Sequence, residues 1–301
     1  MPGTPRRFEW EDALPGLRSG EFEIQVDEAS IRAYKVATGD GSPASEIAPP
    51  GYVFPAAPQR RYATMASIGC RAPEQDPGEP RSTPYVGSDV RFHRPIKVGD
   101  TVRSVTVLDR TFERGGNRFM VFRVDASDAH GTPIAEYDYT VLWERGSQRA
   151  GNAPKRTAPS TPDIRGDSRI GTGTVLVKAE TVQTIAAYGS LPVGRPDDWL
   201  STHTNEDFAR TAIFGATVNA GVATVGYTAQ WLDIVERHGV LWNGGRLESR
   251  ALAPVKAGDD LQIYGELRPA QDDGAGRVYE ILVVNQSGVT AFRSVATLPI
   301  A

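Results

Sequence analysis

Apolar and polar residues alternate through two stretches of the chain that resemble each other. The segments 91-RFHRPIKVGDTVRSVTVL-108 and 250-RALAPVKAGDDLQIYGEL-267 share the start Arg-x-x-x-Pro-x-Lys-x-Gly-Asp. A turn followed by alternating apolar residues predicts a half-buried β-strand in each. Downstream, 118–143 and 277–298 each read as a hairpin, and upstream, 22–34 and 175–188 each predict a strand leading into a helix. The chain is therefore predicted to be an internal duplication.

One predicted element differs between the two copies. Residues 219–239 carry apolar positions at helical spacing and end in Arg-His-Gly, which predicts one long, largely buried helix. The matching stretch 48–70 is interrupted by four prolines, so its helix must be short or displaced. Residues 149–172 are rich in Pro, Gly, Ser and Arg and predict a linker. We expect domains at 1–148 and 173–301 whose strands form one sheet around the helices.

Composition narrows the class of protein. The 301 residues carry a formal net charge of -4, which gives no basic footprint for nucleic acid and no polybasic patch for a membrane surface. A single cysteine, Cys70, excludes an internal disulfide framework. The start of the chain lacks the apolar stretch of a secretory signal, and no apolar run is long enough to span a bilayer. We therefore expect a cytoplasmic protein.

The candidate chemistry lies in 197-DDWLSTHTNEDFA-209, which holds one of only four histidines. His203 follows Asp198 by five residues, and such a pair can share a water and exchange protons with it near neutral pH. The alternative is a histidine near a helix start, with Asn205 as the N-cap residue. His93 reads as a structural or surface residue, His130 as a turn residue and His238 as a helix C-terminal charge. No two histidines have the spacing of zinc ligands.

These segments together resemble the double-hotdog proteins of the MaoC-like (R)-specific enoyl-CoA hydratase/dehydratase family. The resemblance implies an α+β fold of two tandem hotdog units, with a continuous antiparallel sheet around a long central helix. It also implies reversible addition of water to a 2-enoyl thioester, with His203 and Asp198 as the catalytic pair. The family motif has glycine, asparagine and proline where this chain has Asp197, Leu200 and Ser201, so Asp197 is a possible substitute for Asp198.

The resemblance also implies the remaining parts of the site. In 214-FGATVNAG-221, the backbone N–H of Gly221 would receive the negative charge that develops on the thioester oxygen, with Asn219 beside it as a substrate-binding residue. Arg246 and Arg250, together with Lys256, could contact the phosphates of CoA or of a carrier-protein arm. The expected partner is an acyl thioester of CoA or acyl carrier protein. No cofactor or metal is expected.

In the first half, Gly39, Asp40 and Pro43 keep the family spacing, but Ser45 stands where the histidine belongs. This half is therefore expected to be degenerate, and its proline-broken segment would make room for the acyl chain. The other hypotheses are a natural-product dehydratase of the same family, a hotdog thioesterase and a non-catalytic acyl-binding subunit. Both a monomer and a homodimer are compatible with the duplication.

Overall fold

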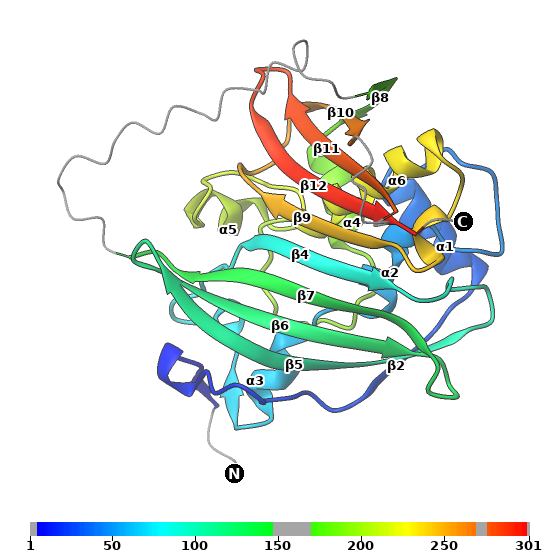
Figure 1. Cartoon of the computed structure of the whole chain (residues 1–301). Helices are drawn as coiled ribbons and strands as arrows, with labels where there is room; N and C mark the ends of the chain where they lie inside the picture. The colour runs from blue at the N-terminus through cyan, green and yellow to red at the C-terminus, as the bar shows by residue number, and fades with distance from the viewer. Residues whose placement is uncertain (1–4, 147–169, 269–275, 300–301) are drawn as a thin grey trace.

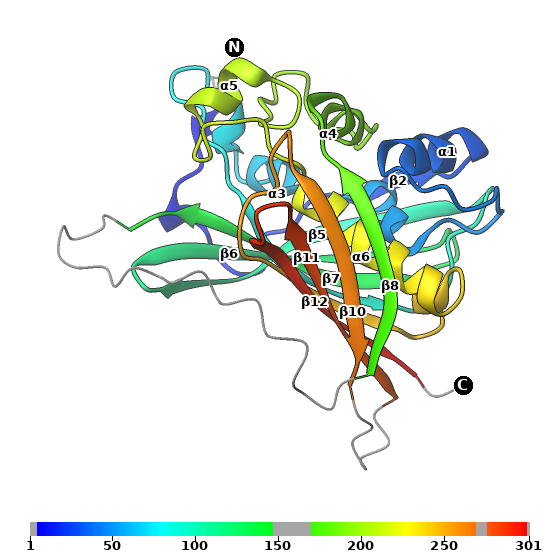
Figure 2. The ribbon, with the colours of Figure 1, turned by 90° about the horizontal axis from the view of Figure 1, so that it is seen from above.

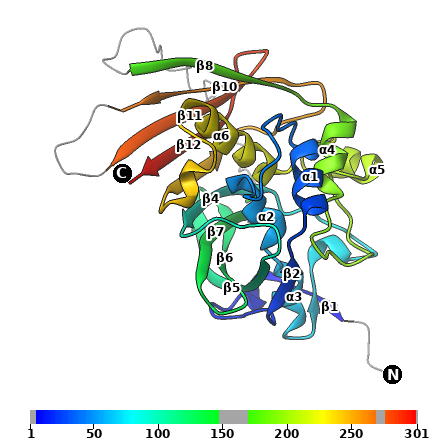
Figure 3. The ribbon, with the colours of Figure 1, turned by 90° about the vertical axis from the view of Figure 1, so that its right-hand side faces the viewer.

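The protein is built on one sheet of ten strands that curves around a long helix (Figure 1). The computed structural model describes residues 5–146, 170–268 and 276–299. The strand order is β2-β5-β6-β7-β4-β9-β12-β11-β10-β8, and every pairing in this sheet is antiparallel. Seen from the side, the helices lie on the concave face of the sheet (Figure 3).

The first half contributes half of the strands and several short helices. Its elements are β1 (Arg6–Arg7), η1 (Trp10–Asp12), β2 (Phe22–Gln25), α1 (Glu28–Ala37), η2 (Pro50–Tyr52), α2 (Val53–Ala56), α3 (Arg61–Ala66), β3 (Cys70–Arg71), η3 (Pro73–Gln75), β4 (Tyr85–Phe92), β5 (Thr101–Arg114), β6 (Asn117–Ser127) and β7 (Pro133–Glu144). β1 and β3 pair with each other, outside the large sheet.

The second half repeats this order with a longer helix. Its elements are β8 (Ile170–Ala179), α4 (Val182–Gly189), α5 (Glu206–Thr211), α6 (Gly221–Val235), η4 (Val240–Trp242), β9 (Arg246–Ala251), β10 (Asp260–Leu267), β11 (Arg277–Asn285) and β12 (Thr290–Leu298). Read outward from the central β4–β9 pair, the two halves of the sheet have the same order, since β7, β6, β5 and β2 correspond to β12, β11, β10 and β8. α1 and α4 pack side by side at matching positions (Figure 2). The predicted duplication is confirmed.

The repeated Gly-Asp motif forms the same turn in both halves. The N–H of Lys97 donates to Asp100 Oδ2 at 2.9 Å, and the N–H of Lys256 donates to Asp259 Oδ2 at 2.8 Å. The glycine between them has φ +91° in the first copy and +93° in the second, a conformation that residues with a Cβ rarely adopt. Equal turns start β5 and β10 in the same register relative to the core.

α6 is buried around most of its circumference, as the all-round apolar sequence predicts. Every residue from Ala223 to Leu232 is buried, and the helix contacts β4, β8, β10, β11 and β12 as well as η2. In the first half the prolines limit the helix to η2 and α2, which leaves space under β6 and β7. Within the described ranges, no helix combines the length and apolar character needed to cross a membrane.

The predicted linker falls mostly outside the described residues. Of the range 149–172, only the last three residues are described, and they belong to β8, which begins at Ile170. The strand therefore starts three residues before the predicted boundary.

Two glycines let the halves approach each other across Tyr34. A Cβ on Gly226 would lie 2.6 Å from Tyr34 Oη, and a Cβ on Gly51 would lie 2.9 Å from the Gly226 Cα. Tyr34 is fully buried, and its hydroxyl has no hydrogen-bond partner among the described residues. This contact joins α1, η2 and α6 in one core.

We expect Gly226→Ala to lower the free energy of unfolding by about 1–3 kcal/mol, because the new methyl group meets the Tyr34 hydroxyl. In a Tyr34→Phe background the next nearest Tyr34 atom, Cζ, is at 3.8 Å, an ordinary contact. There the alanine should be close to neutral or stabilising, since it favours helix by up to about 1 kcal/mol. Urea unfolding of the wild type, the two single variants and the double variant measures the coupling free energy between the two positions. An equal loss of stability on Gly226→Ala in both backgrounds would contradict the contact.

Candidate active site

A cavity of about 620 Å³ lies where the two halves meet, at the N-terminus of α6. One side is formed by residues of the first half, from the segment 54–62, Glu74, the start of β4 and the inner faces of β6 and β7. The other side is formed by the loop 193–203, the segment 218–222 and residues 251–255. Phe54, Pro55 and Pro58 of the proline-broken segment line it, as expected for a half that makes room for a ligand.

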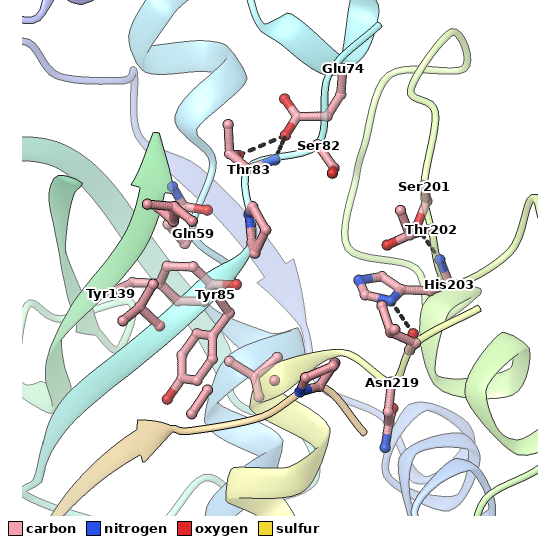
Figure 4. Close-up of a pocket in the computed structure, with 18 of the residues that line it drawn as sticks. Gln59, Glu74, Ser82, Thr83, Tyr85, Tyr139, Ser201, Thr202, His203 and Asn219 are labelled. Carbon is pink, nitrogen blue, oxygen red and sulfur yellow. Dashed lines mark hydrogen bonds between the residues drawn. The ribbon is translucent and has the colours of Figure 1, made fainter. Parts of the chain in front are cut away.

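His203 enters the cavity from the loop between α4 and α5 (Figure 4). The loop ends where Asn205 caps α5, with its side-chain oxygen accepting from the N–H of Phe208 at 2.9 Å, so the predicted N-cap is confirmed. Gly189 at the end of α4 permits the close approach, because a Cβ there would lie 2.8 Å from the Cβ of His203. Helix ends on both sides therefore fix the position of this histidine.

One hydrogen bond assigns the protonation of the imidazole. His203 Nδ1 lies 2.7 Å from the carbonyl oxygen of Val218, which can only accept, so Nδ1 carries the proton. Nε2 is then a free acceptor, and Figure 4 shows the ring turned into the cavity. Enclosure by the protein, followed by the positive charge of Arg195, lowers the pKa of His203 to about 4, against a weaker opposite effect of the Val218 carbonyl. The imidazole is therefore neutral at physiological pH.

The N-terminus of α6 opens onto the same cavity. Ala220 is the N-cap and has no capping side chain, and the N–H groups of Gly221 and Val222 have no acceptor among the described residues. Both residues line the cavity. A Cβ on Gly221 would lie 2.1 Å from Tyr85 Cδ1, so glycine is needed for the ring to pack here. The free N–H groups and the positive end of the helix dipole can bind a developing anion.

The structure does not bring Asp198 and His203 together. Asp198 is exposed, its carboxylate accepts a hydrogen bond from Gln75 Nε2 at 3.1 Å, and it does not line the cavity. Asp197 is also exposed and outside the cavity lining. A separation of five residues left the direction of the two side chains open, and the turn around Trp199 directs them apart. Thr202, buried beside the histidine, does line the cavity.

The expected substrate-binding residues have different surroundings. Asn219 lines the cavity, but its amide nitrogen donates to Glu180 Oε1 at 2.8 Å, in a buried network behind the site. Arg246 forms a bidentate ion pair with Asp89 across the β4–β9 junction, at 2.8 and 2.6 Å. Arg250 is exposed on β9, and neither arginine lines the cavity.

The other histidines lie outside the cavity lining. His93 and His130 are exposed, the latter in the β6–β7 turn as predicted. His238 follows α6 and pairs with Asp233 at 3.1 Å, which raises the pKa of the histidine.

The first half contributes to the cavity a charged group that the sequence did not predict. Arg60, Arg61 and Glu74 line it, with exposed fractions of 5, 9 and 2 %. Glu74 Oε1 pairs with Arg61 and accepts from the N–H and hydroxyl of Thr83 at 3.1 and 2.7 Å, while Oε2 has no partner among the described residues. The adjacent arginines in the apolar stretch 48–70 were the one signal in the sequence.

Comparison with known proteins gives a structural likeness. No family model and no curated protein matches the sequence. HtdX from Mycobacterium tuberculosis is 18% identical, with coverage of 92% of this chain and 98% of that one and a TM-score of 0.63. A MaoC-like dehydratase from Phytophthora capsici is 16% identical, with 95% and 97% coverage and a TM-score of 0.64.

A conserved hypothetical protein from Mycobacterium tuberculosis, described as a double hotdog fold, is 16% identical, with 97% and 98% coverage and a TM-score of 0.57. The predicted α+β double-hotdog fold is thereby confirmed.

We expect His203 to keep its proton on Nδ1 and to remain neutral down to about pH 4, while His238 protonates at higher pH. The folded-state pKa of His203 lies below its unfolded value of about 6.5, so this group destabilises the fold as the pH falls from about 6.5 towards 4. NMR spectra based on two-bond ¹H–¹⁵N couplings measure the tautomer and the titration of each imidazole. The signal of His203 is identified by its absence from the spectrum of the His203→Asn variant. Titration of His203 above pH 6 would contradict the enclosed, neutral ring.

Proposed function

We propose that this double-hotdog protein is a hydro-lyase that adds water reversibly to a 2-enoyl thioester, with one active site per chain. The observation that carries the proposal is the orientation of His203. Its Nδ1–H is held by the Val218 carbonyl, which leaves Nε2 as a proton acceptor on the cavity side. A positioned neutral imidazole of this kind contributes about 10²–10⁴ to the rate as a general base.

The free N–H groups of Gly221 and Val222 form the second part of the proposed site. A thioester carbonyl placed against the N-terminus of α6 would direct its oxygen at these donors. When water adds to the β-carbon, negative charge moves onto that oxygen, and each preorganised donor contributes about 10²–10³ to the rate.

The proton balance requires only the histidine. His203 Nε2 takes a proton from the water as the water oxygen bonds to C3. The C2–C3 π-electrons form a C1–C2 double bond, and the carbonyl π-electrons move onto the thioester oxygen. The imidazolium then returns this proton to C2 as the carbonyl reforms, which completes the addition of one water. The lowered pKa of His203 makes its imidazolium a stronger acid than usual, which favours this second transfer and correspondingly weakens the imidazole as the base in the first. Dehydration is the same sequence in reverse.

Thr202 is the proposed partner for the water, in place of Asp198. Its side chain makes no hydrogen bond within the described part of the chain, and Figure 4 shows it beside His203 at the cavity. A hydroxyl can accept from and donate to the same water, so it can hold the water in line with C3. Asp198 takes no part in the proposed chemistry, because its carboxylate is bound by Gln75.

We expect His203→Asn to lower kcat/KM for hydration of 2-enoyl-CoA esters by about 10²–10⁴, because the amide can replace the Nδ1–H donor to Val218 but not the base. Asp198→Asn should change kcat/KM by less than about threefold, since the contact with Gln75 is solvent-exposed. Loss of enoyl-thioester absorbance over a range of chain lengths measures the rate, and circular dichroism checks the fold of each variant.

Three results would contradict parts of this proposal. Equal rates for the wild type and His203→Asn would show that His203 is not the general base. A large loss in Asp198→Asn would return that residue to the site. Release of free thiol with the double bond intact would favour a thioesterase.

A further inference from the structure

Arg60 is a buried cation at the cavity with no acidic partner. Its guanidinium lies 4.1 Å from the centre of the Phe22 ring, and Nη1 makes only long hydrogen bonds, 3.3 Å to the Tyr62 hydroxyl and 3.5 Å to the Gly194 carbonyl. Within the described residues, Nη2 has no hydrogen-bond partner and no carboxylate lies within ion-pair distance. Burying an unpaired charge is unfavourable, so this group needs an anion to complete its surroundings.

A second arginine of the cavity wall belongs to the loop that Arg60 contacts. Arg60 contacts Gly194, and the following residue, Arg195, also lines the cavity. Arg195 donates from Nη1 to the Gly189 carbonyl at 3.0 Å and has no carboxylate partner in the described part of the chain. By contrast, Arg61 is paired with Glu74. The three arginines and one glutamate therefore leave a positive excess at this wall of the cavity.

The position of this excess relative to the base restricts the ligand group that it can bind. Arg195 Nη1 donates to the Gly189 carbonyl, and Gly189 packs against the Cβ of His203, so this guanidinium lies near the proposed base and the carbon atoms on which it acts. The phosphates of CoA are separated from the thioester sulfur by the whole pantetheine arm. A group bound to Arg60 and Arg195 while the thioester lies at α6 is therefore part of the acyl chain.

We propose that the acyl group of the substrate carries its own carboxylate, which binds Arg60 and Arg195 and selects acidic enoyl thioesters over uncharged ones. Arginine guanidinium groups suit this role because they offer paired N–H donors with the spacing of a carboxylate. The inference rests on the proposed function only in taking an acyl thioester as the ligand of the cavity.

The test is binding, which needs no turnover. Saturated monothioesters of dicarboxylic acids of increasing length are compared by calorimetry with monocarboxylic thioesters of equal length. Each is prepared as the CoA ester and as the N-acetylcysteamine ester, which has no phosphate. At the acyl length that binds most tightly, the dicarboxylic thioester should have a Kd about tenfold or more lower than the monocarboxylic thioester of equal length, in both series. This is the effect expected for a hydrogen bond between charged groups.

Four variants assign the effect. In Arg60→Gln and in Arg195→Gln the preference for the carboxylate should fall to about one-tenth or less of its wild-type value, whereas Arg123→Gln, which removes an exposed, ion-paired arginine from the outer face of the sheet, should keep it. Arg60→Lys should retain part of it by keeping the charge. Since Arg195 lies in an exposed loop, its variant tests the idea even if Arg60→Gln fails to fold.

Two outcomes would overturn the inference. One is the absence of a preference for the carboxylate at every length, or its persistence in both cavity variants. The other is a loss of affinity confined to the CoA series, which would assign the arginines to CoA phosphates. If the protein prefers the carboxylate but hydrates no enoyl ester, the proposed reaction is wrong and the inference about the acyl carboxylate is still supported.

Discussion

The burial of α6 is the constraint on which the rest of the molecule depends. A helix that is apolar on all sides must pack against other elements on all sides, and here it packs against strands of both halves and against η2. Its small residues set the distance between the halves, as Gly226 does against Tyr34. The N-terminus of the same helix has no capping side chain, since Ala220 precedes it, and the N–H groups of Gly221 and Val222 have no acceptor in the described part of the chain.

The sequence predicted most of the fold because the fold is built from local, repeated patterns. The Gly-Asp turns, alternating strands and apolar helix each carry their signal within a few residues, and the duplication shows the signal twice. The prolines in 48–70 likewise predicted a broken helix, seen as η2 and α2. The start of β8 was placed three residues late, since the composition of residues 149–172 masked the first residues of the strand.

The site was less predictable, because its parts come from residues far apart in the chain. His203 and Gly221 both line the cavity, but Asp198 lies outside it and accepts a hydrogen bond from Gln75, which is 123 residues away in sequence. Arg60 contacts Gly194, which is 134 residues away in sequence, and no local pattern predicts this contact. Arg246 appeared available because its partner, Asp89, belongs to the other half.

The joining of two unlike halves in one chain also affects how the protein can change. In a symmetric dimer of identical units, each substitution appears on both sides of the cavity at once. Here His203 and the N-terminus of α6 come from one copy, while much of the rest of the cavity wall comes from the other. Substitutions in the first copy can therefore reshape one side of the cavity while His203 and the helix N-terminus stay unchanged, so the duplication lets the two sides of the cavity evolve separately.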